Sequence, residues 1–504
     1  MKLRLLEIEG YKMFDSKSVF EFKKDLHILI GVNGSGKSTI IEAIAIIFDR
    51  LKSYYSSNQK TLTPFNFKIE YSFVKHTVLE ESSTTQETTT SIDIVSIKKI
   101  GNDEAFSIEF TVNGEPLDSK KDKYNYLPDN LIYYYAGFCE TLNKVVTKNE
   151  QEAAEILYSQ KDKNDVSSFF KEVTKSQIYI RELHFPILFL LNYLDRDQVL
   201  RLTNKSFSIE SIKFFFKKPP KFSNNDYTDL YNLQGLLREF VLNLLPHSQP
   251  MREVREERKH FGFELELEYH RGLLEAVENL PGQSSSLRYT DARYYAFHLL
   301  NLLDHIGLIY DIKITVKDEE DNLYPIRQLS EGEQQLITIE AINKVLTKDN
   351  TVLFFDEPDS FLHPQRQREI LPYIKEQFGD RFSEGYAQLI ITTHSPFVAQ
   401  SIDFENIILF DESGEVLNNK TVVLDTEAIN EVLFGVRERF NEDIEEKLQA
   451  FKTIRDKIIG DKEYDKPALI KIISDLQSYG EETRVIVSRE LAQLSRLKGF
   501  DING

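Results

Sequence analysis

Cysteine is almost absent from this sequence, since Cys139 is the only one in 504 residues. A single cysteine excludes an intrachain disulfide bond and a zinc site built from cysteine thiolates. Long apolar runs are also missing, and the longest candidates, such as residues 185–191, are too short to span a bilayer. Residues 1–10 lack the apolar stretch of a secretory signal peptide. We therefore expect a soluble, cytoplasmic protein.

An excess of positive charge is absent as well, because 81 acidic residues outnumber 62 lysines and arginines, for a net charge of −19. A chain that binds nucleic acid over its whole surface is usually basic, so any such contact must come from a local patch. Residues 213–222 interleave lysines with phenylalanines, which suits stacking on exposed bases. Burial of the phenylalanines, with the lysines at the rim, is the favoured alternative. Residues 252–260 mix both charges and are typical of a solvated helix face.

The hydrophobic pattern changes several times along the chain. The first part reads as strands, a glycine-rich loop and a helix, followed by β-like runs, whereas residues 151–305 show mainly the i, i+3, i+4 spacing of helices. Short apolar runs typical of buried parallel strands return at residues 352–355 and 389–392. After residue 424 the chain is helical and highly charged. These changes predict four segments, which are residues 1–150, 151–305, 306–425 and 426–504.

The strongest motif is Gly-Val-Asn-Gly-Ser-Gly-Lys-Ser at residues 31–38, which matches the P-loop pattern at every fixed position. It follows an apolar strand and opens a helix. Glycines allow backbone N–H groups to surround phosphate oxygens, and the helix N-terminus adds partial positive charge. Lys37 would neutralise the β- and γ-phosphates of ATP, and Ser38 would hold Mg²⁺. The predicted ATP-binding residues of this loop are Asn33, Gly34, Ser35, Gly36, Lys37, Ser38 and Thr39.

Two further apolar runs end in polar residues. Residues 352–355 are followed by Asp356 and Glu357, and a buried strand would project both acids beyond the carboxyl edge of a sheet. Asp356 would then lie near Mg²⁺, and Glu357 would polarise the attacking water as general base. The second run leads to His394, whose place at a strand end suits a sensor of the γ-phosphate. Alone, the acidic pair could equally be a solvated turn; beside a P-loop it favours ATP chemistry.

Leu-Ser-Glu-Gly-Glu at residues 329–333 precedes an apolar-periodic helix. Ser330 is placed as the N-cap and Glu333 stands at the capping-box position, so one interpretation is a well-capped helix and nothing more. The other is that Ser330 and the free amides after it contact an anion, with Gly332 permitting close approach. The residues alone leave both interpretations open.

These motifs, in this order, resemble the ABC-type ATPase heads of the SMC and RecF class. The stretches around Asp356 and His394 look most like the bacterial "overcoming lysogenisation defect", Septu and PARIS ATPases. The charged helical tail at residues 430–499 resembles the ending of Septu- and retron-associated ATPases. The resemblance implies an α/β fold, with a two-lobed P-loop ATPase head made of a mixed or parallel central sheet and an antiparallel β lobe. A helical insertion and a helical C-terminal tail would complete it.

The resemblance also implies how the motifs act. In such heads the signature loop of one subunit closes over ATP held by the P-loop of another. Ser330, Gly332 and Glu333 would therefore complete the ATP site of a second copy, while Glu357 serves as base and His394 as switch. The Q-loop glutamine of these heads cannot be assigned, because Gln59 comes too early and residues 133–137 contain none.

The leading hypothesis is therefore an ATPase that uses ATP and Mg²⁺ to join and separate heads in a homodimer or higher oligomer. No nuclease motif is evident in the sequence, so a separate effector nuclease, regulated in bacterial antiphage defence, is the expected partner. The alternative is a RecF-like ATPase of DNA repair or recombination that binds DNA directly. A neighbouring nuclease gene would favour the first, and salt-sensitive DNA binding the second.

Overall fold

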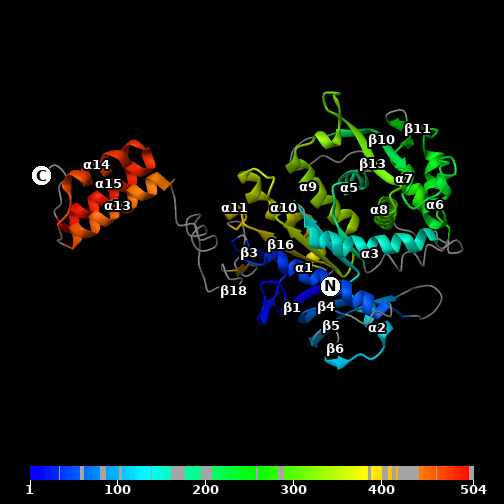
Figure 1. The fold of residues 1–504 in the computed structure, drawn as a ribbon, viewed down its shortest axis with the longest axis horizontal. Helices are drawn as coiled ribbons and strands as arrows, with labels where there is room; N and C mark the ends of the chain where they lie inside the picture. The colour runs from blue at the N-terminus through cyan, green and yellow to red at the C-terminus, as the bar shows by residue number, and fades with distance from the viewer. Residues whose placement is uncertain are drawn as a thin grey trace. The chain divides into compact units, whose positions relative to one another are not determined.

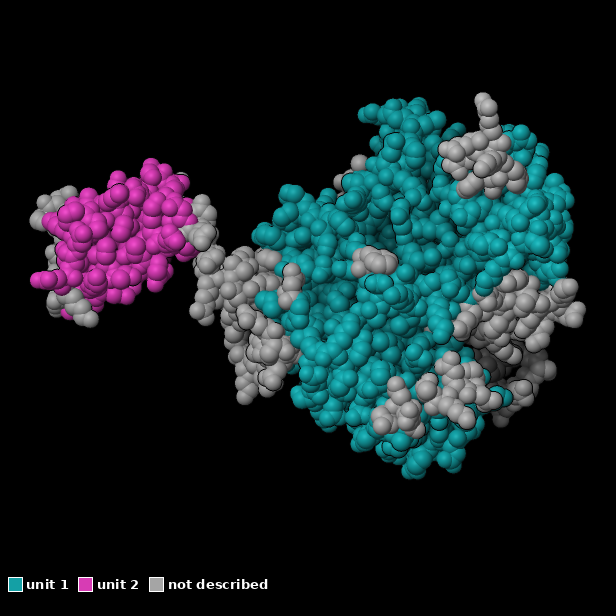
Figure 2. Space-filling view, in the orientation of Figure 1, with its two compact units in different colours: residues 1–422 teal, residues 423–504 magenta. Residues whose placement is uncertain are grey.

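The computed structural model divides into two compact units, residues 1–422 and 423–504 (Figure 2), and each is described by itself. Within the described residues, no helix combines the length and the apolar character needed to cross a membrane. The described residues are 1–32, 34–56, 62–79, 87–101, 105–137, 139–159, 176–193, 207–256, 259–281, 289–383, 387–399, 407–410, 416–417, 442–460 and 463–498.

A seven-stranded sheet lies at the centre of the first unit, with the order β18-β17-β3-β16-β15-β8-β9 (Figure 1). All neighbours are parallel except β17 and β18. Every residue of β3, β15 and β16 is buried, as in a parallel sheet covered on both faces. The residues that follow β3, β8, β15 and β16 therefore meet at one edge. The strands are β3 (Leu26–Ile30), β8 (Asn130–Tyr135), β9 (Ser176–Tyr179), β15 (Thr351–Asp356), β16 (Ala387–Thr393), β17 (Ile407–Phe410) and β18 (Val416–Leu417).

A second, antiparallel sheet has the order β2-β1-β4-β5-β6-β7 and forms the β lobe. Helix α1 (Lys37–Ser56) joins the two lobes, because Ile44 shares one hydrophobic core with Leu6 and Ile69 of the β lobe and with Phe354 of the central sheet. The predicted two-lobed α/β head is confirmed. Its β lobe consists of β1 (Lys2–Glu9), β2 (Ser18–Glu21), β4 (Asn66–Leu79), β5 (Glu87–Gly101), β6 (Phe106–Val112) and β7 (Glu115–Pro116).

The expectation of a mainly helical insertion at residues 151–305 is only partly right, because this segment also supplies strands β10, β11 and β12 to a third sheet. That sheet is antiparallel, with the order β11-β12-β10-β13-β14. The prediction of a helix face at residues 252–260 is wrong for the described part of this range, because residues 252–256 form β11 and residues 259–260 begin β12. The strands are β10 (Phe207–Lys217), β11 (Arg252–Glu256), β12 (Lys259–Leu267), β13 (Ile309–Asp318) and β14 (Leu323–Pro325), and the helices of the segment are α5 (His184–Asn192), α6 (Gly235–Leu244), α7 (Gly272–Glu278) and α8 (Tyr289–His305).

Three phenylalanines of residues 213–222, Phe214, Phe215 and Phe216, belong to the core of this third sheet, and Phe222 is half-buried. Phe214 and Phe216 are fully buried, and the ring of Phe216 stacks on that of Phe263 with centroids 4.7 Å apart. Lys213 stands at the rim, where its Nζ lies 3.2 Å from Glu266 Oε2. Base stacking by these rings is therefore wrong as a prediction, and the alternative of buried phenylalanines with rim lysines is confirmed.

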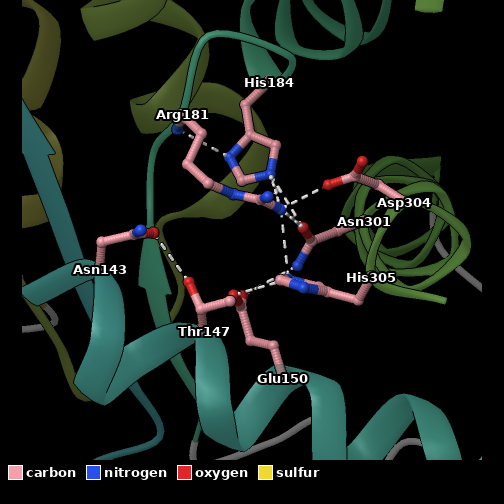
Figure 3. A network of polar contacts seen from close by, with 8 residues as sticks. All are labelled: Asn143, Thr147, Glu150, Arg181, His184, Asn301, Asp304 and His305. Atoms are coloured by element: carbon pink, nitrogen blue, oxygen red, sulfur yellow. Dashed lines mark hydrogen bonds and ion pairs between the residues drawn. The ribbon is translucent and has the colours of Figure 1, made fainter. Parts of the chain in front are cut away.

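A buried polar network connects helices α3 (Glu140–Ser159), α5 and α8 (Figure 3). Arg181 Nη2 lies 2.7 Å from Asp304 Oδ2, and His305 Nε2 lies 2.8 Å from Glu150 Oε2. Burial and the nearby guanidinium hold the pKa of His184 well below its usual range. The side chains of Glu150 and His305 are buried and those of Arg181 and Asp304 are partly buried, and charged groups removed from water need such partners. The network therefore helps to fix how the three helices meet.

The second unit is helical, as the sequence predicts for the tail. Three helices share a core that includes Phe451, Leu469, Leu476 and Val487. Asp465 caps the middle helix by accepting a hydrogen bond from the backbone N–H of Ala468 at 3.0 Å. The helices are α13 (Glu442–Ile459), α14 (Lys466–Ser478) and α15 (Glu481–Lys498), and those of the first unit not yet given are α2 (Lys120–Asn125), α9 (Glu331–Ala341), α10 (Pro364–Ser383) and α11 (Pro396–Ala399).

Candidate nucleotide-binding site

The predicted P-loop links the end of β3 to the start of α1 and requires glycine at two of its positions. Gly34 and Gly36 have φ angles of +84° and +93°, which residues with a side chain adopt only at a cost. A Cβ on Gly36 would also lie 2.5 Å from Met13 Sδ and 2.8 Å from Phe14 Cζ. The loop is thus held closely against the turn that contains Met13 and Phe14. Asn33 lies outside the described residues.

Lys37 lies folded back over this loop. Its Nζ donates hydrogen bonds to the backbone oxygens of Gly31, at 2.8 Å, and Val32, at 3.0 Å. Burial lowers the pKa of Lys37, and the carboxylates of Glu357 and Asp356 partly offset this effect. The ammonium group is therefore placed at the loop together with the two predicted acids, as a phosphate-binding lysine must be.

A buried hydroxyl within the loop lacks a partner. The Oγ atom of Ser35 makes no hydrogen bond to any described residue, although the side chain is fully buried. Buried polar groups are nearly always hydrogen-bonded, so an orphaned hydroxyl in a phosphate loop fits a ligand that supplies acceptors. The residues present therefore fit a bound nucleoside triphosphate.

Asp356 is buried where β15 ends and holds two neighbouring segments. Its carboxylate accepts hydrogen bonds from the hydroxyls of Thr392, at the end of β16, and Ser38, in the first turn of α1. Burial raises the pKa of Asp356, and these two hydrogen bonds oppose the shift. Hydroxyl and carboxylate oxygens are ligands that Mg²⁺ prefers. Ser38 and Asp356, predicted separately from two motifs 318 positions apart in the printed sequence, lie in contact.

Glu357 has a φ angle of +54°, an unusual backbone conformation for a residue with a long side chain. Its backbone N–H donates to the carbonyl of Thr392 at 3.1 Å and lies 3.2 Å from the hydroxyl of the same residue. Glu357 Oε1 lies 3.2 Å from His394 Nδ1, and Oε2 accepts a hydrogen bond from Ser360 Oγ at 3.3 Å. Strained residues of this kind cluster at active sites, because the surrounding structure must stabilise them.

The signature residues form the capped helix start that the sequence predicts. Ser330 Oγ accepts from the Glu333 backbone N–H, and the Glu333 carboxylate accepts from the Ser330 backbone N–H at 2.9 Å, which completes a capping box. A Cβ on Gly332 would lie 3.2 Å from both Leu362 Cδ2 and the backbone oxygen of Phe361. Ser330 is exposed, and no hydrogen bond or ion pair found among the described residues joins it to Lys37. The role of this loop toward phosphate stays a prediction.

Sequence reasoning missed several residues that the fold brings to the site. Glu42, one helical turn beyond Ser38, pairs with Lys12 and lies within 3.4 Å of Cys139 Sγ. Thr392 was missed although it ends an apolar run next to His394, which was the available signal.

Thr39, which the sequence predicts as an ATP-binding residue, lies half-buried in the first turn of α1.

The comparisons with known proteins agree with this geometry. A family model described as "AAA domain, putative AbiEii toxin, Type IV TA system" matches residues 26–399, from β3 to α11, which is most of the chain. The chain belongs to this family. The predicted resemblance to bacterial ATPase heads and retron-associated ATPases is thereby confirmed.

Two proteins with similar sequences align with this chain over most of their lengths. The "Retron Ec83 probable ATPase" of Escherichia coli is 24% identical over 441 residues, covering 80% of this chain and 70% of that protein. The "Retron Vc95 probable ATPase" of Vibrio cholerae is 21% identical over 441 residues, covering 82% of this chain and 74% of that protein.

Among solved structures, an SMC head bound to the C-winged helix domain of ScpA aligns with 82% of this chain over 96% of its own length, with 14% identity and a TM-score of 0.34.

Replacing Gly36 with alanine should abolish tight ATP binding, because the new Cβ would overlap Met13 and Phe14 and the φ angle of +93° would be strained. We expect the dissociation constant, measured by calorimetry, to rise at least about tenfold, in keeping with the cost of overpacking. Gly114→Ala is the matched control, since Gly114 has a similar φ angle of +86° with no atom within 4 Å of its Cβ position. Unchanged affinity in Gly36→Ala would contradict this description of the loop.

Asp359 should make the first unit less stable as the pH rises. Burial raises its pKa to about 6, although Thr393 Oγ1 donates to it at 3.0 Å. Between about pH 4 and pH 6 the folded chain then binds more protons than the unfolded chain, so the free energy of unfolding falls as the pH increases. Relative to Asp359→Asn, wild type should lose up to about 3 kcal/mol across this window in urea unfolding. Parallel pH profiles for the two proteins would show that Asp359 titrates normally.

Proposed function

We propose that this protein binds ATP with Mg²⁺ and hydrolyses it. The observation that carries the proposal is the convergence of Lys37, Ser38, Asp356, Glu357 and His394 at one edge of the parallel sheet. Membership of an AAA ATPase family and similarity to two retron-associated probable ATPases support it.

Each residue has a physical role in this reaction. The backbone of residues 31–38 and the N-terminus of α1 bind the phosphates, and Lys37 exchanges its two carbonyl partners for phosphate oxygens. Ser38 and Asp356 would hold Mg²⁺, which when bound neutralises charge on the phosphates. Glu357 accepts the proton of the attacking water, and His394, 3.2 Å away, orients the glutamate carboxylate.

We further propose that the site is completed by a second copy of the chain. Ser330 and Gly332 stand exposed or half-exposed at the N-terminus of α9, where the free amides and the helix dipole favour an anion. Contact between this helix end and ATP held by another copy would pair the heads. ATP binding would then join the subunits, and hydrolysis would separate them.

The names of two relatives support a proposal for the biological setting. The two probable ATPases described above carry retron in their names, and the chain covers at least 70% of each of them. We therefore propose that the ATP-driven pairing of heads controls a separate effector nuclease in bacterial antiphage defence. Purification with the neighbouring gene products should yield a complex whose mass changes with ATP. Strong DNA cleavage by this chain alone, or DNA-stimulated turnover with a steep salt dependence, would instead favour a nuclease or a RecF-like DNA-binding ATPase.

Glu357→Gln should lower the rate of phosphate release at least about 100-fold, because the amide cannot accept the proton of the attacking water. The substituted chain should still bind ATP and should accumulate as paired heads, detected by light scattering. Glu369→Gln is the control, since Glu369 is an exposed residue of α10 that pairs with Arg366 at 2.8 Å. A turnover rate equal to wild type would remove Glu357 from the role of base.

Ser330→Arg should block pairing while leaving ATP binding intact, because a long cation would fill the space that a second copy must approach. ATP-dependent oligomers should disappear in sedimentation velocity, with the affinity for ATP unchanged. Ser330→Ala separates this effect from loss of the N-cap, which costs about 1 kcal/mol of helix stability. If the arginine variant still pairs in ATP, the signature helix is not the contact.

A further inference from the structure

The strand order places the carboxyl end of β8 directly beside the acidic end of β15. Strand β15 lies between β16 and β8, and Asp356 is in register with Thr392 on one side and with Tyr135 on the other. The backbone N–H of Ala136 donates to the carbonyl of Asp356 at 3.3 Å, so the pairing continues one residue beyond β8. Glu357 therefore follows a strand that is flanked by His394 on one side and Tyr135 on the other.

The phenol ring of Tyr135 lies against a glycine two residues later. A Cβ on Gly137 would lie 3.0 Å from Tyr135 Cζ and 3.1 Å from its hydroxyl oxygen, closer than nearly all real Cβ contacts. The φ angle of Gly137 is not in the left-handed region, so the backbone itself would accept alanine. Because Gly137 has no side chain, Cζ and the hydroxyl group of Tyr135 can occupy the space beside its Cα.

Tyr135 also faces open space and keeps its hydroxyl available. The ring is half-buried and lines a cavity of about 550 Å³ with Gly137, Tyr179 and Gln334. Within the described residues no hydrogen bond to its hydroxyl is found. Burial, followed by the carboxylates of Glu357 and Asp356, raises the pKa of Tyr135. At neutral pH the group is a neutral phenol, which can both donate and accept a hydrogen bond.

We propose that Tyr135 is a positioning residue for ATP hydrolysis, whose hydroxyl orients the water that Glu357 activates, from the side of β15 opposite His394. This inference rests on the proposed ATPase function. Glu357 alone can polarise a water molecule, but a second hydrogen bond is needed to fix the direction of its attack on phosphorus. Tyr135 is the tyrosine whose register position brings it level with Asp356 at the edge where the proposed phosphate, metal and base residues meet.

The first test compares single substitutions under single-turnover and steady-state conditions. Tyr135→Phe should lower kcat roughly 10- to 100-fold, while the dissociation constant for ATP, measured by calorimetry, changes less than about twofold. Tyr135→Gln should recover part of the lost rate, because an amide both donates and accepts hydrogen bonds. Tyr134→Phe, which removes a hydroxyl from the adjacent residue of the same strand, should hydrolyse ATP at the wild-type rate.

The second test uses Gly137. Gly137→Ala should lower kcat by pushing the Tyr135 ring and its hydroxyl aside. It should have no further effect on kcat in a Tyr135→Phe background, because the displaced ring then carries no hydroxyl to misplace. Additive losses in the double variant would overturn the inference, as would a wild-type rate in Tyr135→Phe. A parallel loss of ATP affinity and thermal stability in Tyr135→Phe would assign a structural role instead and would also overturn it. Failure of the proposed function gives a different result, because wild type itself would then not hydrolyse ATP. An active wild type with an equally active Tyr135→Phe would reject only the role of Tyr135.

Discussion

The hydrogen bonds of the Asp356 carboxylate are the interaction on which the rest of the site depends. This buried group accepts from Ser38 at the start of α1 and from Thr392 at the end of β16, so it joins the P-loop, the acidic strand and the strand of His394. Thr392 in turn receives the backbone N–H of Glu357 and stabilises its left-handed conformation. One buried carboxylate therefore fixes the relative positions of the P-loop segment, Glu357 and His394. The proposed nucleotide chemistry depends on those positions, because a misplaced base cannot direct water at phosphorus.

Sequence patterns within short segments predicted the structural features that depend only on residues close together in the chain. The strand, glycine loop and helix around Lys37 lie within about thirty residues, and the capping box at Ser330 depends on atoms only three residues apart, so both follow from spacing alone. The structure of the insertion at residues 151–305 was harder to predict from the sequence. Its strand β10 pairs with β12 and β13, and no pattern within one segment encodes that distant pairing. For the same reason residues 252–260 resembled a helix face, although residues 252–256 and 259–260 belong to paired antiparallel strands.

Residues that act through the order of strands could not be predicted from the sequence. Nothing near Tyr135 indicates that β8 lies beside β15, and nothing near Glu42 indicates that Lys12 and Cys139 meet it. Sheet order is a tertiary property, set by the burial of both sheet faces and by the crossover connections between parallel strands. The sequence thus indicated the loop and the acids that the structure brings together, but not the neighbours that lie beside them.

The central claim is that one ATP site is built from two copies of this chain. Chains carrying Ser330→Arg and chains carrying Glu357→Gln should each be inactive alone, for different reasons. In a mixed dimer, one site combines an intact P-loop and Glu357 from the first chain with an intact Ser330 from the second. Mixing the two purified variants and measuring phosphate release should therefore restore a rate well above the sum of the separate rates. Each mixed dimer carries the Ser330→Arg substitution at one of its two contacts, so sedimentation velocity must first show that the two variants pair with each other. A mixture that stays at that sum, although the two chains bind ATP and form mixed dimers, would contradict the account.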